Sequence, residues 1–178
     1  MKIVIIRHLP TYWNMEDLLQ GTQDIEVLPP NHYHNCEIKK NRKKLKNEFN
    51  FDLVLCSELK RTKQTANLYG YKNLIIDPLL NELNFGYFEG KEKSELSKVV
   101  NWVENPRDVV LGESLIDFEK RIKSFIDKYI TLDTLLIFGH GAWIRGLISI
   151  NKWGNINKMN QFHINNNEII VIEGKENE

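Results

Sequence analysis

The sequence has few cysteines, no long apolar run and no excess of one charge. Only two cysteines occur among 178 residues, and Cys56 lies inside an apolar run, so a reduced, cytoplasmic protein is expected rather than a disulfide-linked one. No apolar stretch reaches 18 residues, and the first is only four residues long before Arg7, so neither a membrane span nor a signal peptide is expected. Lys and Arg number 24, as do Asp and Glu, so no net charge draws the chain to nucleic acid or to an anionic membrane. Any affinity for phosphate must therefore come from a local arrangement.

The remaining composition is that of a globular domain, with 42% hydrophobic and 27% charged residues. Apolar runs alternate with segments of helical pattern, which predicts a three-layer α/β/α sandwich with a mostly parallel central sheet. No repeat, linker or domain boundary interrupts this pattern, so one domain over residues 1–178 is predicted. The predicted strands are 3–6, 51–57, 73–77 and 134–138, with a final antiparallel pair at 161–164 and 168–173. The predicted helices are 15–20, 32–47, 58–70, 94–104, 115–129 and 142–150.

Two features outside the predicted strands are interpreted as surface. The basic run between Lys39 and Lys46 has no interleaved aromatic residue, which favours a solvated helix face over a nucleic-acid site. His32 and His34 have no Cys or acidic partner at ligand spacing, so no metal site is predicted there.

Polar residues stand at the carboxyl ends of three predicted strands. Arg7 and His8 follow the first, Ser57 and then Arg61 follow the second, and His140 follows the fourth. Carboxyl ends of parallel strands meet at one edge of the sheet, where ligands bind in open α/β folds. Two arginines, two histidines and the N-termini of the following helices predict a phosphate site at that edge.

Such a site suits phosphoryl transfer to a histidine. A neutral imidazole attacks phosphorus when its other nitrogen is held by an acceptor, and donors already in place stabilise the charge on the phosphoryl oxygens. The leaving alkoxide needs an acid opposite the nucleophile, and Glu82, close to Phe85, is the candidate. A zinc site on the two histidines is disfavoured because the arginines would repel the cation.

These residues resemble the motifs of the histidine phosphatase superfamily, in its phosphoglycerate mutase-like branch. Residues 7–14 are similar to the opening Arg-His-Gly-x-Thr-x-x-Asn motif, with Leu9 in place of the glycine and Pro10 after it. The further matches, in the family's order, are 57–66 to Ser-x-Leu-x-Arg-x-x-Gln-Thr-Ala, 82–90 to Glu-x-x-Phe-Gly-x-x-Glu-Gly, 112–114 to Gly-Glu-Ser, and 139–141 with Arg145 to the last catalytic motif. The resemblance runs from residue 3 to about 150, and the departure at Leu9 bears on specificity more than on catalysis.

The resemblance implies a phosphoglycerate mutase-like fold and an enzyme without metal or cofactor that acts on a small phosphorylated substrate. It implies that His8 is phosphorylated on nitrogen and that Glu82 donates and later recovers a proton. The implied phosphoryl and substrate contacts are Arg7, Arg61 and the catalytic His140, with Asn14, Gln20, Gly21 and Gly141 around them.

Three functions are compatible with that resemblance. Hydrolysis of a phosphomonoester is favoured, because only about 30 residues separate Glu82 from Gly112 and a short lid at about 86–113 would admit water. The alternative is a phosphoglycerate-type mutase, which returns the phosphoryl group to its product. A non-catalytic phosphate-binding module is the third, and it is disfavoured because both histidines, both arginines and the acid are present. The sequence leaves the oligomeric state open.

Overall fold

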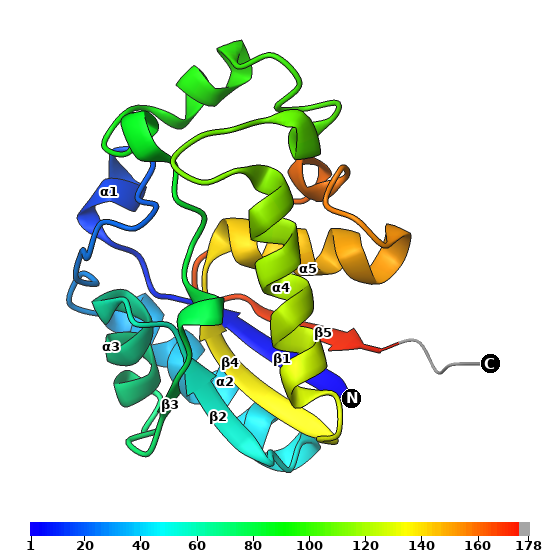
Figure 1. Cartoon of the computed structure of the whole chain (residues 1–178). Helices are drawn as coiled ribbons and strands as arrows, with labels where there is room; N and C mark the ends of the chain where they lie inside the picture. The colour runs from blue at the N-terminus through cyan, green and yellow to red at the C-terminus, as the bar shows by residue number, and fades with distance from the viewer. Residues whose placement is uncertain (175–178) are drawn as a thin grey trace.

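The computed structural model describes residues 1–174, and within them five strands form one sheet in the order β3-β2-β4-β1-β5 (Figure 1). Strands β1 to β4 are parallel, and β5 runs antiparallel to β1 at one edge. The strands are β1 Lys2–Arg7, β2 Leu53–Cys56, β3 Ile75–Ile76, β4 Thr134–Gly139 and β5 Ile169–Glu173. The α-helices are α1 Tyr12–Met15, α2 His32–Glu48, α3 Lys60–Leu68, α4 Leu115–Tyr129 and α5 Gly141–Trp153.

Alternate residues of the central strands pack into two cores, one on each face of the sheet. Ile3 and Ile5 of β1 belong to a core shared with α4 and α5, whereas Val4 and Ile6 belong to a core shared with α2 and α3. Figure 1 accordingly shows α4 in front of the sheet and α2 behind it. Each of these buried aliphatic side chains contributes roughly 1.5–3 kcal/mol through burial. The predicted three-layer α/β/α fold is confirmed.

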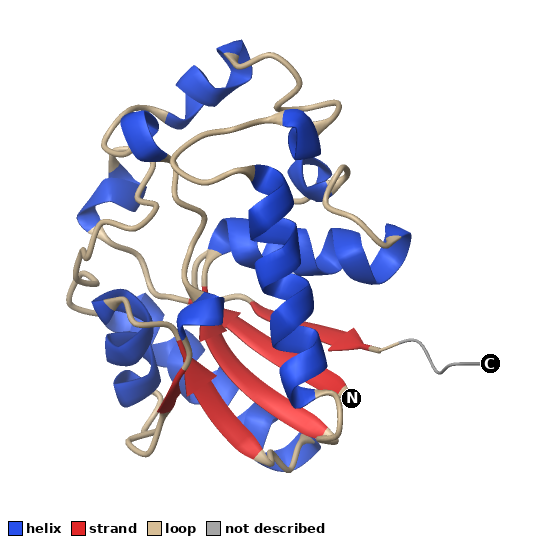
Figure 2. Cartoon of the chain, in the orientation of Figure 1, coloured by secondary structure: helices blue, strands red, loops and turns tan. Residues whose placement is uncertain are grey.

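The half of the molecule beyond the carboxyl ends of the strands is made of loops and short helices, as Figure 2 shows. Residues 86–113 lie there, and their regular structure consists of the 3₁₀ helices Gly86–Phe88, Lys93–Lys98 and Pro106–Asp108. The α-helix predicted at 94–104 is therefore wrong. Its first residues form one short 3₁₀ helix, and turns follow up to Glu104.

Three other predictions differ from the structure. Residues 161–164 form no strand, and β5 pairs with β1 instead of closing a hairpin with them. The short helix predicted at 15–20 lies earlier, at Tyr12–Met15, because Thr11 and Asn14 cap each other's backbone N–H groups. The strand predicted at 73–77 is reduced to two residues.

The two cysteines are free, Cys36 exposed and Cys56 buried, which confirms that no disulfide forms. Burial raises the pKa of the Cys56 thiol to about 11, so this thiol stays protonated at neutral pH. Over residues 1–174, no helix combines the length and apolar character that crossing a bilayer requires.

Candidate active site

The register of the sheet brings the two motif histidines together. Arg7 of β1 pairs with Gly139 of β4, so His8 and His140 leave the sheet side by side, with ring centroids 5.5 Å apart. Strand β2 pairs with β4 in the same direction, and Ser57 follows it at the same edge. The strand ends thus meet where the sequence analysis placed them.

His8 is held in the form that a nucleophile requires. Its ring is 2% exposed, and Nδ1 lies 2.7 Å from the carbonyl oxygen of Leu9. A carbonyl only accepts hydrogen bonds, so Nδ1 carries the proton and Nε2 keeps its lone pair. Burial, together with the charges of Arg61 and Arg7, holds the pKa of His8 well below its usual range. The ring is therefore neutral at pH 7.

His140 has the opposite tautomer. The Nε–H of Arg61 donates to Nδ1 over 3.2 Å, and Nε2 lies 2.7 Å from the hydroxyl oxygen of Ser57. Nδ1 must accept, so Nε2 carries the proton and donates to Ser57. Burial and the charge of Arg61 hold the pKa of His140 well below its usual range as well. Both ring nitrogens already have partners, so direct contact of His140 with a phosphoryl group stays a prediction.

We expect a titration of His8 and His140 to show that both rings are neutral and that they have opposite tautomers. A histidine whose folded pKa is lowered stays neutral as the pH falls, while the unfolded chain takes up its proton near pH 6.5, so both groups make the fold less stable below that pH. Long-range ¹H–¹⁵N spectra of histidine-labelled protein, assigned with His8→Gln and His140→Gln, should show two neutral rings at pH 6. His8 should be protonated on Nδ1 and His140 on Nε2. Titration of either ring near 6.5, or identical tautomers, would contradict this arrangement.

Arg61 lies fully buried at the start of α3, and two backbone carbonyl oxygens fix the orientation of its guanidinium. Its terminal nitrogens donate to the carbonyl oxygens of Gln23 and Gly21, each over 2.7 Å. With the bond to His140, three of its five N–H groups are used, and two remain for a ligand. Burial lowers the pKa of Arg61 to about 10, so the group remains charged at neutral pH.

The loop that supplies these carbonyls is fixed by Glu89, for which the sequence analysis proposed no role. The Glu89 carboxylate accepts the backbone N–H of Thr22 over 2.9 Å and the side-chain amide of Gln23 over 2.7 Å. Gly21 has a φ of +51°, and a Cβ built on it would lie 2.1 Å from Oε1 of Glu89. Only glycine fits this position. Because the carbonyls of Gly21 and Gln23 bind Arg61, Glu89 positions Arg61 by holding this loop.

A pocket of about 120 Å³ opens beside His8. It is strongly electropositive, because three arginines line it and Glu82 is its one acidic residue. The predicted site residues that line it are Arg7, His8, Asn14, Gln20, Gly21, Arg61, Glu82 and Gly141. Its other lining residues are Leu18, Leu19, Phe85, Lys93, Ala142, Arg145, His163 and Ile164.

Arg7 enters this pocket from the end of β1. One terminal nitrogen donates to the carbonyl oxygen of Ile164 over 2.5 Å, whereas the buried Nε has no partner within residues 1–174. A Cβ built on Gly141 would lie 3.4 Å from that Nε. This is an ordinary contact distance, so Gly141 lies beside the guanidinium without clearing space for it.

Asn14 and Gln20 lie on the pocket wall with unused polar groups. The Oδ1 of Asn14 accepts the N–H of Thr11 over 3.0 Å and the amide of Asn166 over 3.3 Å, while its own NH₂ donates to no described residue. The Oε1 of Gln20 is buried without a partner among residues 1–174. An amide with open donors can bind a phosphate oxygen, which is the role predicted for Asn14.

Glu82 sits at the N-terminus of α5. Its carboxylate is 8% exposed and accepts the backbone N–H groups of Ala142 over 3.0 Å and Trp143 over 3.1 Å. Helix N-termini were predicted to supply backbone donors to a phosphate, and at α5 two of these donors bind this carboxylate instead. At α3, Asp24 likewise accepts the N–H of Lys60 over 2.7 Å.

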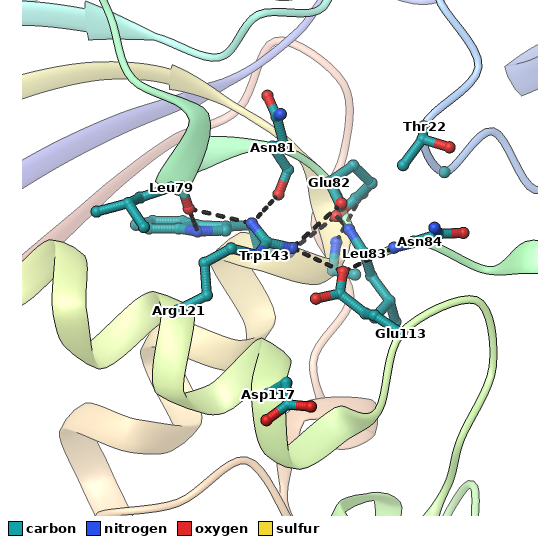
Figure 3. A network of polar contacts seen from close by, with 12 residues as sticks. Thr22, Leu79, Asn81, Glu82, Leu83, Asn84, Glu113, Asp117, Arg121 and Trp143 are labelled. Carbon is teal, nitrogen blue, oxygen red and sulfur yellow. Dashed lines mark hydrogen bonds and ion pairs between the residues drawn. The ribbon is translucent and has the colours of Figure 1, made fainter.

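The backbone around Glu82 is clamped from two helices, as Figure 3 shows. Arg121 of α4 donates to the carbonyl oxygens of Asn81 over 2.6 Å and Glu82 over 3.3 Å, and it pairs with Glu113 at 2.8 Å. The indole N–H of Trp143 donates to the carbonyl oxygen of Leu79 over 2.8 Å. Figure 3 shows Glu113 engaged in this network, so it positions the acid rather than facing the pocket.

Arg145, Lys93 and His163 were not predicted to line the pocket. Arg145 was matched to the last catalytic motif but given no place in the pocket, and it lies four residues after Gly141 on the same face of α5. Lys93 and His163 come from segments predicted as a lid and a strand, and neither pattern indicates the pocket.

The pocket offers no set of metal ligands. Over the described part of the chain, no group of three or more His, Cys, Asp or Glu side chains is arranged to hold a metal ion.

Comparison with known proteins agrees with this geometry. The sequence model of the histidine phosphatase superfamily (branch 1) matches residues 3–178. A putative phosphoserine phosphatase 2 of Hydrogenobacter thermophilus is 25% identical over 96% of this chain and 88% of its own. The alpha-ribazole phosphatase of Shigella flexneri is 26% identical, with a TM-score of 0.76 over 97% of this chain and 90% of its own. A phosphoserine phosphatase of Entamoeba histolytica, solved in complex with 3-phosphoglyceric acid, is 25% identical, with a TM-score of 0.77 over 96% and 89%.

Proposed function

This chain belongs to the histidine phosphatase superfamily, and from that premise we propose that it hydrolyses a small phosphorylated metabolite through a phosphohistidine on His8. The observation that carries the proposal is the neutral His8, protonated on Nδ1, in a pocket that it shares with Arg7 and Arg61. The phosphatases among its relatives support hydrolysis.

In the first step, the lone pair on Nε2 of His8 attacks phosphorus and the ester P–O bond breaks. Arg7 and the two remaining N–H groups of Arg61 hold the phosphoryl oxygens as charge develops on them. Glu82 gives its proton to the leaving oxygen, which departs as an alcohol.

In the second step, water completes hydrolysis. The Glu82 carboxylate takes a proton from water, the hydroxide oxygen bonds to phosphorus, and the P–N bond breaks. Inorganic phosphate leaves, and His8 and the protonated Glu82 are restored. The bonds from α5 and the clamp by Arg121 hold Glu82 in place for both steps.

The segment 86–113 supports hydrolysis over mutase activity. We propose that it forms a short lid over the pocket. Its residues 90–93 pair with 17–19, through the N–H of Gly90 to Leu19 and of Lys93 to Asp17. A lid of 3₁₀ turns without a long helix leaves water access to the phosphohistidine, whereas a mutase must exclude water until the product is rephosphorylated. The free thiols fit a reducing compartment, and we propose the cytoplasm.

Release of inorganic phosphate from a panel of phosphorylated metabolites tests the proposal. We expect turnover with at least one small phosphomonoester, undiminished by EDTA, because the described residues hold no cluster of metal ligands. Isomerised product in place of free phosphate would indicate a mutase. Activity lost in EDTA and restored by a divalent ion would contradict the metal-independent mechanism.

A further inference from the structure

Arg145 is the unmatched cation of the pocket. It lies one turn into α5 and lines the pocket with Arg7 and Arg61, yet none of its nitrogens makes a hydrogen bond or ion pair with a residue in 1–174. Its Nε is buried with no partner. A buried guanidinium nitrogen without an acceptor carries a desolvation penalty. This cost is offset if a bound ligand supplies the acceptor.

The positive charge of Arg145 exceeds what a bound phosphomonoester needs for charge balance. A phosphomonoester dianion carries two negative charges, which Arg7 and Arg61 match. Glu82 is the one acidic residue of the lining, and in the proposed mechanism it carries a proton while the ester is bound, so it adds no negative charge at that stage. Of the three arginine charges in this pocket, that of Arg145 therefore remains unmatched.

The other two basic side chains of the pocket wall already have polar partners. Lys93 pairs with Asp17 at 2.5 Å, and Nε2 of His163 lies 3.2 Å from Oδ1 of Asn165. Among the cationic side chains outside the phosphoryl site, Arg145 is thus the one with all its donors open within the described residues.

We propose that Arg145 selects substrates that carry a carboxylate a few bonds from the phosphate ester, an inference that rests on the proposed phosphatase function. A planar guanidinium binds the two oxygens of a carboxylate as a fork, and its single charge matches that of a carboxylate. A second phosphate would bring two more charges against this one cation. Arg145 lines the same pocket of about 120 Å³ as Arg7 and Arg61, so the carboxylate should lie close to the phosphate.

Matched substrate pairs test the inference. Phosphoserine is compared with phosphoethanolamine, and phosphoglycolate with methyl phosphate, so that in each pair a hydrogen replaces the carboxylate and nothing else changes. A bidentate charge-assisted contact is expected to favour the carboxylate member by about 10- to 100-fold in kcat/KM. Arg145→Met should bring this ratio close to one, and Arg145→Lys, which keeps the charge without the fork, should give an intermediate ratio.

Lys152→Met is the matched control. It removes one positive charge from the same helix, outside the pocket lining, and should leave the ratio at its wild-type value. If the wild type hydrolyses no phosphomonoester, the proposed function itself fails. If it hydrolyses both members of each pair within about threefold, or if Arg145→Met lowers both equally, the function stands and the role of Arg145 is overturned. Preference for a bisphosphate over both carboxylate substrates would also overturn it.

Discussion

Replacement of His8 by alanine is expected to lower kcat/KM by at least about 10³-fold, because it removes the nucleophile and not merely one contact. The neighbouring His140 cannot take its place. His140 has its Nδ1 occupied by Arg61 and its Nε2 protonated toward Ser57, so it presents no lone pair to phosphorus.

The measurement combines steady-state rates with trapping of the intermediate. Brief reaction with a ³²P-labelled ester should leave acid-labile, base-stable label on the wild type and none on His8→Ala. His32→Ala is the control, since that histidine lies exposed at the start of α2. Thermal unfolding should accompany the assay, because His8 is buried and its loss leaves a cavity. A folded His8→Ala protein that retained more than about a tenth of the wild-type rate would disprove the covalent mechanism.

The sheet and its catalytic edge were predictable because their signals are local. The apolar runs of β1 and β4 are continuous, as expected of strands covered on both faces, and the residue after each strand is a histidine. Once the strands are parallel neighbours, register alone brings His8 and His140 together. The fold and the core of the site therefore follow from a few short segments.

What the sequence did not reveal depends on contacts between distant segments. Residues 161–164 have the apolar pattern of a strand, but the carbonyl of Ile164 accepts from Arg7 instead of joining a sheet. Glu82 reaches the N-terminus of α5 across 60 residues of chain, and this contact removes donors that the sequence analysis had assigned to phosphate. Glu89 acts on Arg61 only through the loop around Gly21. No local periodicity encodes such contacts.

Glu82→Gln is expected to separate proton donation from phosphoryl binding. Glutamine keeps the size of the side chain, and its one amide oxygen can still accept from one of the two α5 N–H groups, but it cannot supply a proton. An alkyl phosphate leaves as a basic alkoxide, so the substitution should cost about 10²–10⁴-fold in kcat/KM on an alkyl ester. On p-nitrophenyl phosphate the loss should be much smaller, because p-nitrophenolate leaves without a proton.

Arg61→Ala provides the contrast that makes the result interpretable. It removes donors to the phosphoryl oxygens, which both substrates share, so kcat/KM should fall by a similar factor on each. Both variants are measured on both substrates, and the informative quantity is the ratio of the two losses.

Equal losses for Glu82→Gln would make Glu82 a structural carboxylate. The structure then offers no simple substitute, because Glu82 is the one acid in the pocket lining, Glu89 is bonded to Thr22 and Gln23, and Glu113 is paired with Arg121. Proton transfer would in that case have to come from water or from the substrate's own phosphate, and the rate on alkyl esters should then fall as the phosphate monoanion ionises.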